Sequence, residues 1–109
     1  MKAPALRSKY LTDSARGRQC TLQIPGICNF NRETVVLCHL PSLTHGMAYK
    51  SDDFWAVFGC SDCHDVIDGR TPYDWRPGER EEIYLQALHA TQRVWFEEEL
   101  LTAKGGRFA

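Results

Sequence analysis

Apolar residues recur over the last third of the chain at the spacing of an α-helix. From Glu79 to about Lys104 they fall on one stripe, and three glutamates stand in the first turn, where the N-terminus of a helix is positive. We therefore expect an amphipathic helix over 79–104 whose stripe packs on the core, followed by a frayed tail over 105–109. The stripe contains Ile83, Tyr84, Ala87, Leu88, Thr91, Val94, Trp95 and Leu101.

Two apolar runs in the middle of the chain predict a β-hairpin. Residues 34–40 are rich in β-branched and apolar side chains and stop at a proline, and residues 54–59 form the second run. The residues from 41 to 53 have the composition of a loop. We expect antiparallel pairing of the two runs, with His39 near the end of the first strand.

The segments around the hairpin are shorter and less regular. Residues 1–19 show no sustained period and predict an extended or partly mobile arm. An alternating run at 21–24, directly before a Pro-Gly turn, predicts a short strand. After the hairpin, Ser61 or Asp62 can cap a helix that continues through Ile67 and stops at a glycine.

Together these elements predict one small α+β domain with a long C-terminal helix. A chain of 109 residues buries too little apolar surface to rely on core packing alone, so we expect an additional staple. We divide it into a basic arm (1–19), a ββα core (20–78) and the amphipathic helix with its tail (79–109). No signal sequence or transmembrane-length segment is readable, which predicts a cytoplasmic protein with reduced thiols and no membrane partner.

The net charge of −1 does not by itself favour a nucleic-acid partner, but the distribution of charge is more informative. Residues 1–18 contain five basic side chains and a single aspartate, which suits contact with a polyanion. Residues 51–69 contain five aspartates and no lysine or arginine, an excess that a bound cation would offset. Either run taken alone also fits ordinary solvated surface.

Cysteine spacing supplies candidate metal ligands. Cys60 and Cys63 are separated by two residues, as in a zinc knuckle, where a tight turn brings both sulfurs to one ion. Cys20 and Cys28 form a second pair around the Pro-Gly turn. Together the pairs predict a structural Zn²⁺ site that ties the N-terminal loop to the hairpin, with buried free thiols as the alternative. Cys38, in an apolar strand, is expected to be buried and inert.

Two other interpretations of the same residues are weaker. The string Cys60-Ser61-Asp62-Cys63-His64 matches the pattern of covalent haem attachment, which takes place outside the cytoplasm, so we expect no haem. A thioredoxin-like redox motif requires a βαβ context, which the predicted elements do not provide.

Histidines near these cysteines predict a second centre. His64 and Asp68 are four residues apart on the predicted helix and share a face, with Asp65 as an alternative ligand. With water in the remaining positions, a histidine and a carboxylate suit Mg²⁺, Mn²⁺ or a second Zn²⁺. In the expected hairpin His39 can face this ion and take a proton from an attacking water. Such an arrangement supports phosphodiester hydrolysis.

Several of these motifs, taken in order, resemble a known nuclease motif. The strand ending in His39, the long loop, the second strand and the string Cys60-x-x-Cys63-His64-x-x-Ile67-Asp68 are similar to the ββα-metal (HNH, His-Me finger) motif. More narrowly, Arg16-Gly17-Arg18-x-Cys20 and Ile24-Pro25-Gly26-x-Cys28-Asn29 resemble the small prophage-encoded YbcO-like family, which is related to phage nucleases that enhance recombination. The resemblance extends from about Arg16 to Arg70 and, as a helix, to the end.

The resemblance implies DNA as substrate in a bacterial host cell, with a structural zinc at Cys20, Cys28, Cys60 and Cys63, His39 as general base and His64 as ligand of a catalytic metal. Two positions depart from the HNH pattern. Cys38 stands where many HNH nucleases have an acidic metal ligand. The loop also lacks the asparagine that often orients the base, which leaves His45, Asp52 or Asp53 for that role.

We therefore expect a zinc-stapled HNH-type endonuclease that cuts DNA with a divalent ion and holds phosphates through Arg16, Arg18, Lys50 and Arg70. The competing hypothesis is a zinc-binding module that holds DNA or a recombination protein, such as a recombinase, without cleaving. A nuclease needs both His39 and His64 whereas a binding module needs neither, so their joint presence favours the enzyme.

Overall fold

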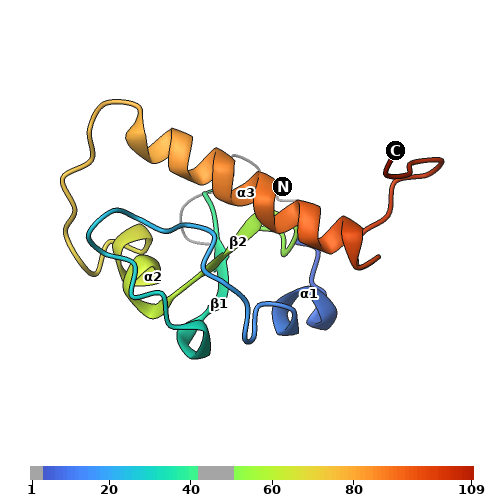
Figure 1. Ribbon diagram of the computed structural model, residues 1–109, viewed down its shortest axis with the longest axis horizontal. Helices are drawn as coiled ribbons and strands as arrows, with labels where there is room; N and C mark the ends of the chain where they lie inside the picture. The colour runs from blue at the N-terminus through green and yellow to red at the C-terminus, as the bar shows by residue number, and fades with distance from the viewer. Residues whose placement is uncertain (1–3, 42–50) are drawn as a thin grey trace.

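The computed structural model describes residues 4–41 and 51–109, whose helices are arranged around a two-stranded sheet (Figure 1). In chain order the elements are α1 (Lys9–Asp13), η1 (Arg32–Thr34), β1 (Val36–His39), β2 (Ala56–Gly59), α2 (Ser61–Ile67) and α3 (Glu79–Glu97). The long helix α3 crosses the sheet, and α1 and α2 lie on either side of the hairpin. None of the helices in the described ranges has the length and apolarity needed to span a membrane.

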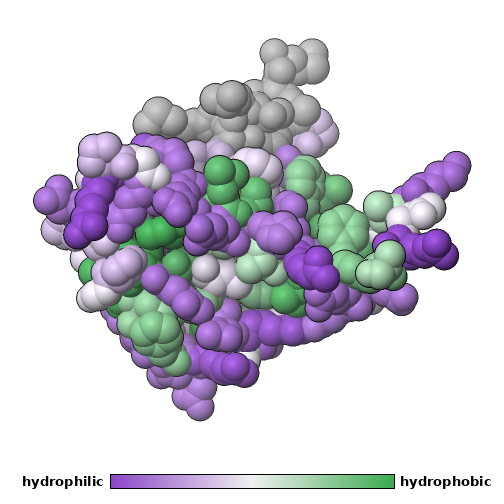
Figure 2. All heavy atoms as spheres, turned by 45° about the horizontal axis from the view of Figure 1, so that its top comes forward, coloured by the Kyte–Doolittle hydropathy of each residue, from purple (hydrophilic) through white to green (hydrophobic). Residues whose placement is uncertain are grey.

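The hairpin forms as predicted. β1 and β2 pair antiparallel, with Val36 opposite Gly59 and His39 opposite Ala56. Cys38, Ala56 and Val57 have no solvent exposure. On the face of the molecule shown in Figure 2, hydrophobic residues lie in separate groups among hydrophilic ones. Because Cys38, Ala56 and Val57 are buried, the apolar runs that predicted the two strands form part of the core.

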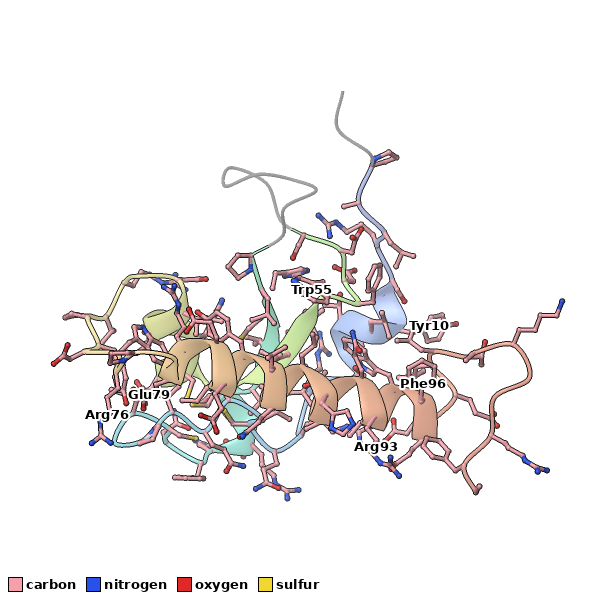
Figure 3. All side chains as sticks on the ribbon, turned by 90° about the horizontal axis from the view of Figure 1, so that it is seen from above. Tyr10, Trp55, Arg76, Glu79, Arg93 and Phe96 are labelled. Carbon is pink, nitrogen blue, oxygen red and sulfur yellow. The ribbon has the colours of Figure 1, made fainter. Side chains whose placement is uncertain are left out.

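The helix α3 packs on β2 through the stripe read from the sequence. Trp95 meets Phe58 edge to face, with ring centroids 5.9 Å apart, and both side chains are buried. Thr91 is also buried, and its hydroxyl accepts a hydrogen bond from the N–H of Phe58 at 3.2 Å, so this donor of β2 is paired inside the core. Ala87 and Leu88 complete the buried part of the stripe. Figure 3 shows the helix from above, with Glu79 near one end and Phe96 near the other.

The helix ends at Glu97, earlier than the predicted end near Lys104. Glu99 adopts a positive φ of 59°, and the N–H of Leu100 turns back to the carbonyl of Trp95 at 2.8 Å. Leu100 and Leu101 pack against the core from this turn. Hydrophobic periodicity alone cannot distinguish such a turn from one more helical turn, so it overestimated the length of the helix.

Part of the N-terminal arm is helical, where we expected extended chain. Residues 9–13 form α1, which begins after Ser8, and the Ser8 hydroxyl accepts the N–H of Leu11 at 3.3 Å as a helix cap. Leu11 is buried, and the indole N–H of Trp95 donates to the Ser14 hydroxyl at 2.8 Å. A single short helix with one buried leucine is too brief to produce a readable period, so the prediction missed it.

The predicted strand at 21–24 does not form. Thr21 does pair with β2, because its N–H donates to the carbonyl of Phe58 at 2.8 Å. Gln23, however, has a φ of 45°, in the left-handed region, and a strand cannot continue through such a residue. This part of the chain is therefore a loop attached to the edge of β2.

The helix α2 follows β2 directly and is capped by Cys60 instead of Ser61 or Asp62. The Sγ of Cys60 accepts the N–H of Cys63 at 3.4 Å, and the helix runs from Ser61 to Ile67. It stops before Gly69, whose φ of 79° is easy for glycine and costly for other residues. The helix predicted here is confirmed, and its capping atom is a sulfur that also belongs to the cysteine cluster described below.

Gly59, the last residue of β2, has no room for a side chain. A Cβ at this position would lie 2.6 Å from the Sγ of Cys38 and 3.0 Å from Leu22 Cδ1, both in the core. Gly59→Ala is therefore expected to lower the free energy of unfolding by about 1–3 kcal/mol, the usual cost of overpacking. Urea denaturation measures this loss. In a double-mutant cycle Cys38→Ala should relieve it, whereas strictly additive effects would show that the strain does not involve the Cys38 sulfur.

Candidate metal centre and histidine site

Four of the five cysteines meet at one point. The loop before β1 contributes Cys20 and Cys28, and the turn from β2 into α2 contributes Cys60 and Cys63. Their sulfur atoms all lie within 4.8 Å of one another, and three of the four residues are buried. The structure thus brings together the four cysteines that the sequence analysis grouped.

The spacing of the sulfurs fits a tetrahedral thiolate centre. With metal–sulfur bonds of about 2.3 Å, sulfurs at the corners of a tetrahedron lie about 3.8 Å apart. The Sγ atoms of Cys28 and Cys60 are 3.9 Å apart. Four largely enclosed sulfurs at this spacing could hold a structural metal such as Zn²⁺.

Backbone N–H groups point at two of these sulfurs. Gln23 donates to the Sγ of Cys20, and Cys63 donates to the Sγ of Cys60, each at 3.4 Å. The left-handed conformation of Gln23, which interrupts the predicted strand, is the one that aims its N–H at Cys20. Because N–H donors stabilise negative charge on an acceptor, the local backbone favours thiolates at these positions.

The thiols also influence one another's protonation. A hydrogen bond from Cys63 lowers the pKa of Cys20 to about 5. Burial and the negative charge at Cys20 raise the pKa of Cys28 to about 11, and the hydrogen bond to Cys20, together with burial, raises the pKa of Cys63. Since one thiolate suppresses ionisation of its neighbours, four thiolates at this point require a cation to compensate them.

Cys38 lies in β1, outside this group. Its side chain is fully buried, and burial raises the pKa of its thiol to about 12. The S–H donates to the carbonyl of Gly59 at 3.8 Å. Cys38 is therefore a neutral core thiol, consistent with the prediction from its apolar strand.

His39, at the end of β1, is held by a buried carboxylate. Its Nε2 lies 2.8 Å from Oδ1 of Asp53, which is only 4% exposed. The second oxygen of Asp53 accepts the N–H of Ser8 at 2.7 Å, and the guanidinium of Arg7 donates to Oδ1 at 3.2 Å. His39 is thus oriented by a carboxylate that the N-terminal arm fixes in place.

Among the three residues considered for orienting His39, Asp53 makes the contact. Asp52 instead accepts the N–H of Leu6 at 2.7 Å, and the carbonyl of Leu6 accepts the N–H of Asp53 at 2.9 Å. His45 lies outside the described residues. Residues 6–8 of the arm therefore bind residues 52 and 53, which precede β2. Asp53 is positioned as part of that pairing.

Asp53 is expected to make stability depend on pH in acid. Burial alone would raise the pKa of its carboxyl, but the hydrogen bonds from His39 and Ser8 and the charge of Arg7 outweigh burial and lower the pKa below its ordinary value of 3.8. Asp53→Asn is expected to lower the free energy of unfolding by about 1–3 kcal/mol at pH 7. Because the pKa of this carboxyl is lower in the folded state, its charged form stabilises the fold at pH values above the unfolded-state pKa. The difference in free energy of unfolding between the wild type and Asp53→Asn, the gap, therefore closes as the pH falls below about 4.

Urea denaturation of both proteins at pH 7, 5, 4 and 3 measures this gap. Acid also releases a thiolate-bound metal from both proteins, so the difference between them is the quantity to compare. Asp74→Asn, at an exposed aspartate, is the matched control and should show no gap at any pH. A gap for Asp53→Asn that stays constant from pH 7 to pH 3 would contradict the role of its charge.

His64 and Asp68 lie together on α2, with Nε2 of His64 3.0 Å from Oδ2 of Asp68. Arg70 donates to the same carboxylate oxygen at 2.8 Å and approaches Asp65 at 3.3 Å. Arg70, considered from sequence as a phosphate contact, is therefore placed against the carboxylates of α2. A cation at the His64–Asp68 pair would compete with Arg70 for Asp68.

The two histidines have different partners in the structure. His39 binds Asp53 beside the arm and opens into a cavity of about 350 Å³, which Arg7 and Arg16 also line and His64 does not. Within residues 4–41 and 51–109, the four cysteines are the only group of three or more side chains close enough to hold a metal ion. An ion at His64 would therefore take further ligands from water or substrate. That His39 faces such an ion stays a prediction.

The other arginines expected at DNA have separate surroundings. Arg16 has a largely exposed side chain, 3.9 Å from Asp13, at the cavity beside His39. Arg18 pairs with Glu98 and donates to the carbonyl of Ser14 at 3.1 Å. Lys50 lies outside the described residues. The sequence did not identify Arg7 as part of the His39 site, because its contact with Asp53, 46 positions later, leaves no motif in the sequence.

Comparison with known proteins gives a consistent result. Residues 9–100 match the family described as "Putative nuclease YbcO". Two curated relatives carry the same description, one from Escherichia coli (strain K12) and one from Enterobacteria phage 82. Each is 42% identical over 95 residues, which cover 85% of this chain and 97% of the relative. A solved structure of a putative bacteriophage protein from Escherichia coli str. K-12 is similar with a TM-score of 0.64 and 39% identity, covering 81% of this chain and 98% of that one.

Proposed function

Because the chain belongs to the family described as "Putative nuclease YbcO", we propose that it is a metal-dependent DNA endonuclease of the HNH type, with His39 as general base and a divalent ion at His64 and Asp68. The family description supports a nuclease, that is, a hydrolase acting on nucleic acid.

The observation that carries the proposal is the partly buried contact between His39 and Asp53. A carboxylate that accepts a hydrogen bond from Nε2 keeps the proton on that nitrogen, which leaves Nδ1 of the neutral ring as the proton acceptor. A histidine whose ring is fixed in this way can take the proton of an attacking water without first reorienting. The adjoining cavity has Arg7 and Arg16 in its lining, beside Asp13 and Asp53, and these two arginines are proposed to receive a phosphate.

The His64–Asp68 pair is proposed as the protein part of the catalytic metal site. An imidazole and a carboxylate four residues apart on one helix face offer two ligands of a type that Mg²⁺, Mn²⁺ and Zn²⁺ accept. The chemistry that such an ion supplies is polarisation of the phosphate and stabilisation of the leaving oxygen. A cation held by His64 and Asp68 would weaken the ion pair between Arg70 and Asp68, while Arg70 would keep its contact with Asp65.

DNA binding is proposed to be mainly electrostatic. Arg16, Arg18 and Arg70 lie on the described surface, and Lys50 is proposed as a further phosphate contact. Contacts of this kind position the duplex without reading its sequence, and they weaken with salt. The four-cysteine centre has a structural role in this proposal, since its sulfurs leave no ligand position open to substrate.

A nicking assay on supercoiled plasmid tests the function directly. Purified protein is incubated with DNA and Mg²⁺, Mn²⁺ or Zn²⁺, and the conversion to open-circular and linear forms is followed on a gel. We expect conversion with at least one of these ions and none when excess chelator is added at the start. Binding of DNA without cleavage under all three ions would reject the enzyme and identify a zinc-binding DNA module.

A further inference from the structure

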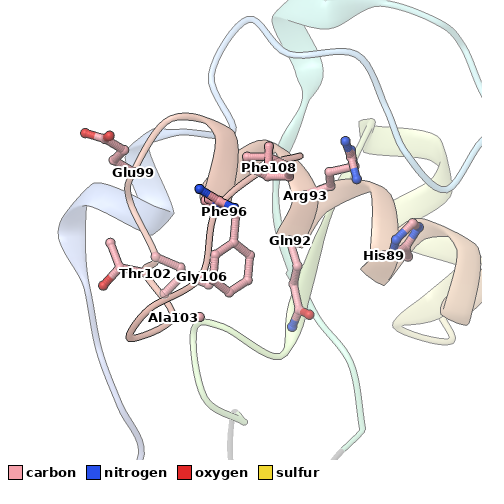
Figure 4. Close-up of a pocket in the computed structure, with 11 residues that line it drawn as sticks. His89, Gln92, Arg93, Phe96, Glu99, Thr102, Ala103, Gly106 and Phe108 are labelled. Atoms are coloured by element: carbon pink, nitrogen blue, oxygen red, sulfur yellow. The ribbon is translucent and has the colours of Figure 1, made fainter.

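A groove at the C-terminal end of α3 has no part in the proposed reaction. It has a volume of about 580 Å³ and lies between the last turns of α3 and the segment that follows the helix (Figure 4). The segment contributes Leu101 to Phe108, which lie beyond the residues matched by the family, 9–100. The groove shares no lining residue with the cavity at His39.

Two exposed aromatic rings face this groove. Phe96 comes from α3 and is 37% exposed, and Phe108 comes from the tail and is 56% exposed. The guanidinium of Arg93 lies 4.9 Å from the centroid of the Phe108 ring, which fixes that ring and covers one of its faces. Because both phenylalanines are exposed and line the groove, a flat group can contact either of them there.

The groove combines these rings with positive charge and with hydrogen-bonding side chains. Residues 101–109 contain Lys104 and Arg107 and no acidic side chain, and Arg107 lines the groove. Gln92 and Thr102 add hydrogen-bonding groups to its walls, and Glu99 is the acidic side chain among the lining residues. Aromatic faces next to cations and polar groups are the features by which proteins hold unpaired nucleotides.

We propose that this groove binds an unpaired nucleotide of single-stranded DNA, with the base against Phe96 and Phe108 and the phosphate at Arg107. The volume lies within the range of pockets that take small organic ligands, and a nucleotide is such a group. The identification of DNA as the polymer rests on the proposed function. The groove provides a second point of attachment for the strand, separate from His39, and gives the protein a preference for DNA with an unpaired segment.

Fluorescence anisotropy with a labelled 12-residue oligothymidylate tests the groove, with a duplex of the same length for comparison. The titrations contain no added divalent ion, so that cleavage does not interfere. Phe108→Ala is expected to weaken binding of the single strand at least about fivefold, the factor that corresponds to loss of one stacking contact, and to leave duplex binding unchanged. Arg107→Ala should weaken single-strand binding and lower its dependence on salt.

Leu85→Ala is the matched control, because Leu85 is an exposed apolar residue of α3 outside the groove. It should bind both DNAs like the wild type. Unchanged single-strand affinity in Phe108→Ala, or an equal loss on single strand and duplex, would overturn the proposal. If the protein binds the single strand through Phe108 but cleaves no DNA, the proposed nuclease is refuted and the nucleotide-binding groove is retained. If it cleaves DNA normally and Phe108→Ala has no effect on binding, the groove is refuted and the nuclease is retained.

Discussion

Cys60→Ser is expected to abolish tight metal binding and to leave most of the chain unfolded at 25 °C. Binding of a structural Zn²⁺ by thiolates contributes on the order of 10 kcal/mol, which is comparable with the whole stability of a typical domain, about 5–15 kcal/mol. In this chain the cysteine cluster joins the loop before β1 to the start of α2, and the sheet has only two strands. A sheet of that size is marginal without further support.

Metal analysis and far-ultraviolet circular dichroism measure this effect. The wild type should carry about one zinc per chain and lose its cooperative unfolding transition when a strong chelator removes it. Cys38→Ala is the matched control, because it removes a buried thiol outside the cluster and should retain the metal. A metal-free wild type, or Cys60→Ser, that still unfolds cooperatively would show that the fold does not depend on the cluster.

His39→Ala is expected to slow plasmid nicking about 10²–10⁴-fold with little change in zinc content. This is the usual contribution of a general base, and here the variant also leaves the buried carboxylate of Asp53 without its histidine partner. Part of the effect could come from structure instead of proton transfer. Added imidazole separates the two, because a small base can enter the vacated space beside Asp53 and restore part of the rate, whereas a misfolded site gains nothing from it.

His64→Ala provides the comparison within the same assay. Its effect should depend on metal concentration, since a proposed ligand of the catalytic ion is lost, while the defect of His39→Ala should persist at saturating Mg²⁺ or Mn²⁺. Imidazole rescue is expected for His39→Ala alone. Wild-type rates in both variants would reject the roles proposed for the two histidines.

The hairpin, α2, most of α3 and the meeting of the cysteines could be predicted because each has a local signal. β1 and β2 are apolar runs, α3 has a stripe at helical spacing, and Cys60-x-x-Cys63 is a turn whose geometry follows from the separation of the two residues. Pairing of the two cysteine pairs then followed from the small size of the domain, which needs a staple. These inferences required no knowledge of which distant side chains touch.

Distant contacts that leave no motif in the sequence could not be predicted. The contacts of Arg7 and Ser8 with Asp53 join residues about 45 positions apart, and neither partner has a periodic or spaced signature. The resemblance to the HNH motif left three candidates in the loop for the residue that orients His39, and only the path of the arm distinguishes Asp53 among them. Arg70 looked like a free cation because its ion pairs with Asp65 and Asp68 depend on how the chain turns after α2.

The separation of the cysteine pairs has a consequence for the order of folding. Cys60 and Cys63 are one turn apart and can capture an ion while the remainder of the chain is unfolded, whereas Cys28 and Cys60 are 32 residues apart. Recruitment of the distant pair closes a loop that contains both β-strands, at an entropic cost that grows only slowly with loop length. The strands then search for each other inside a closed ring. Metal bound by all four cysteines would therefore shorten the search by which the two strands find each other.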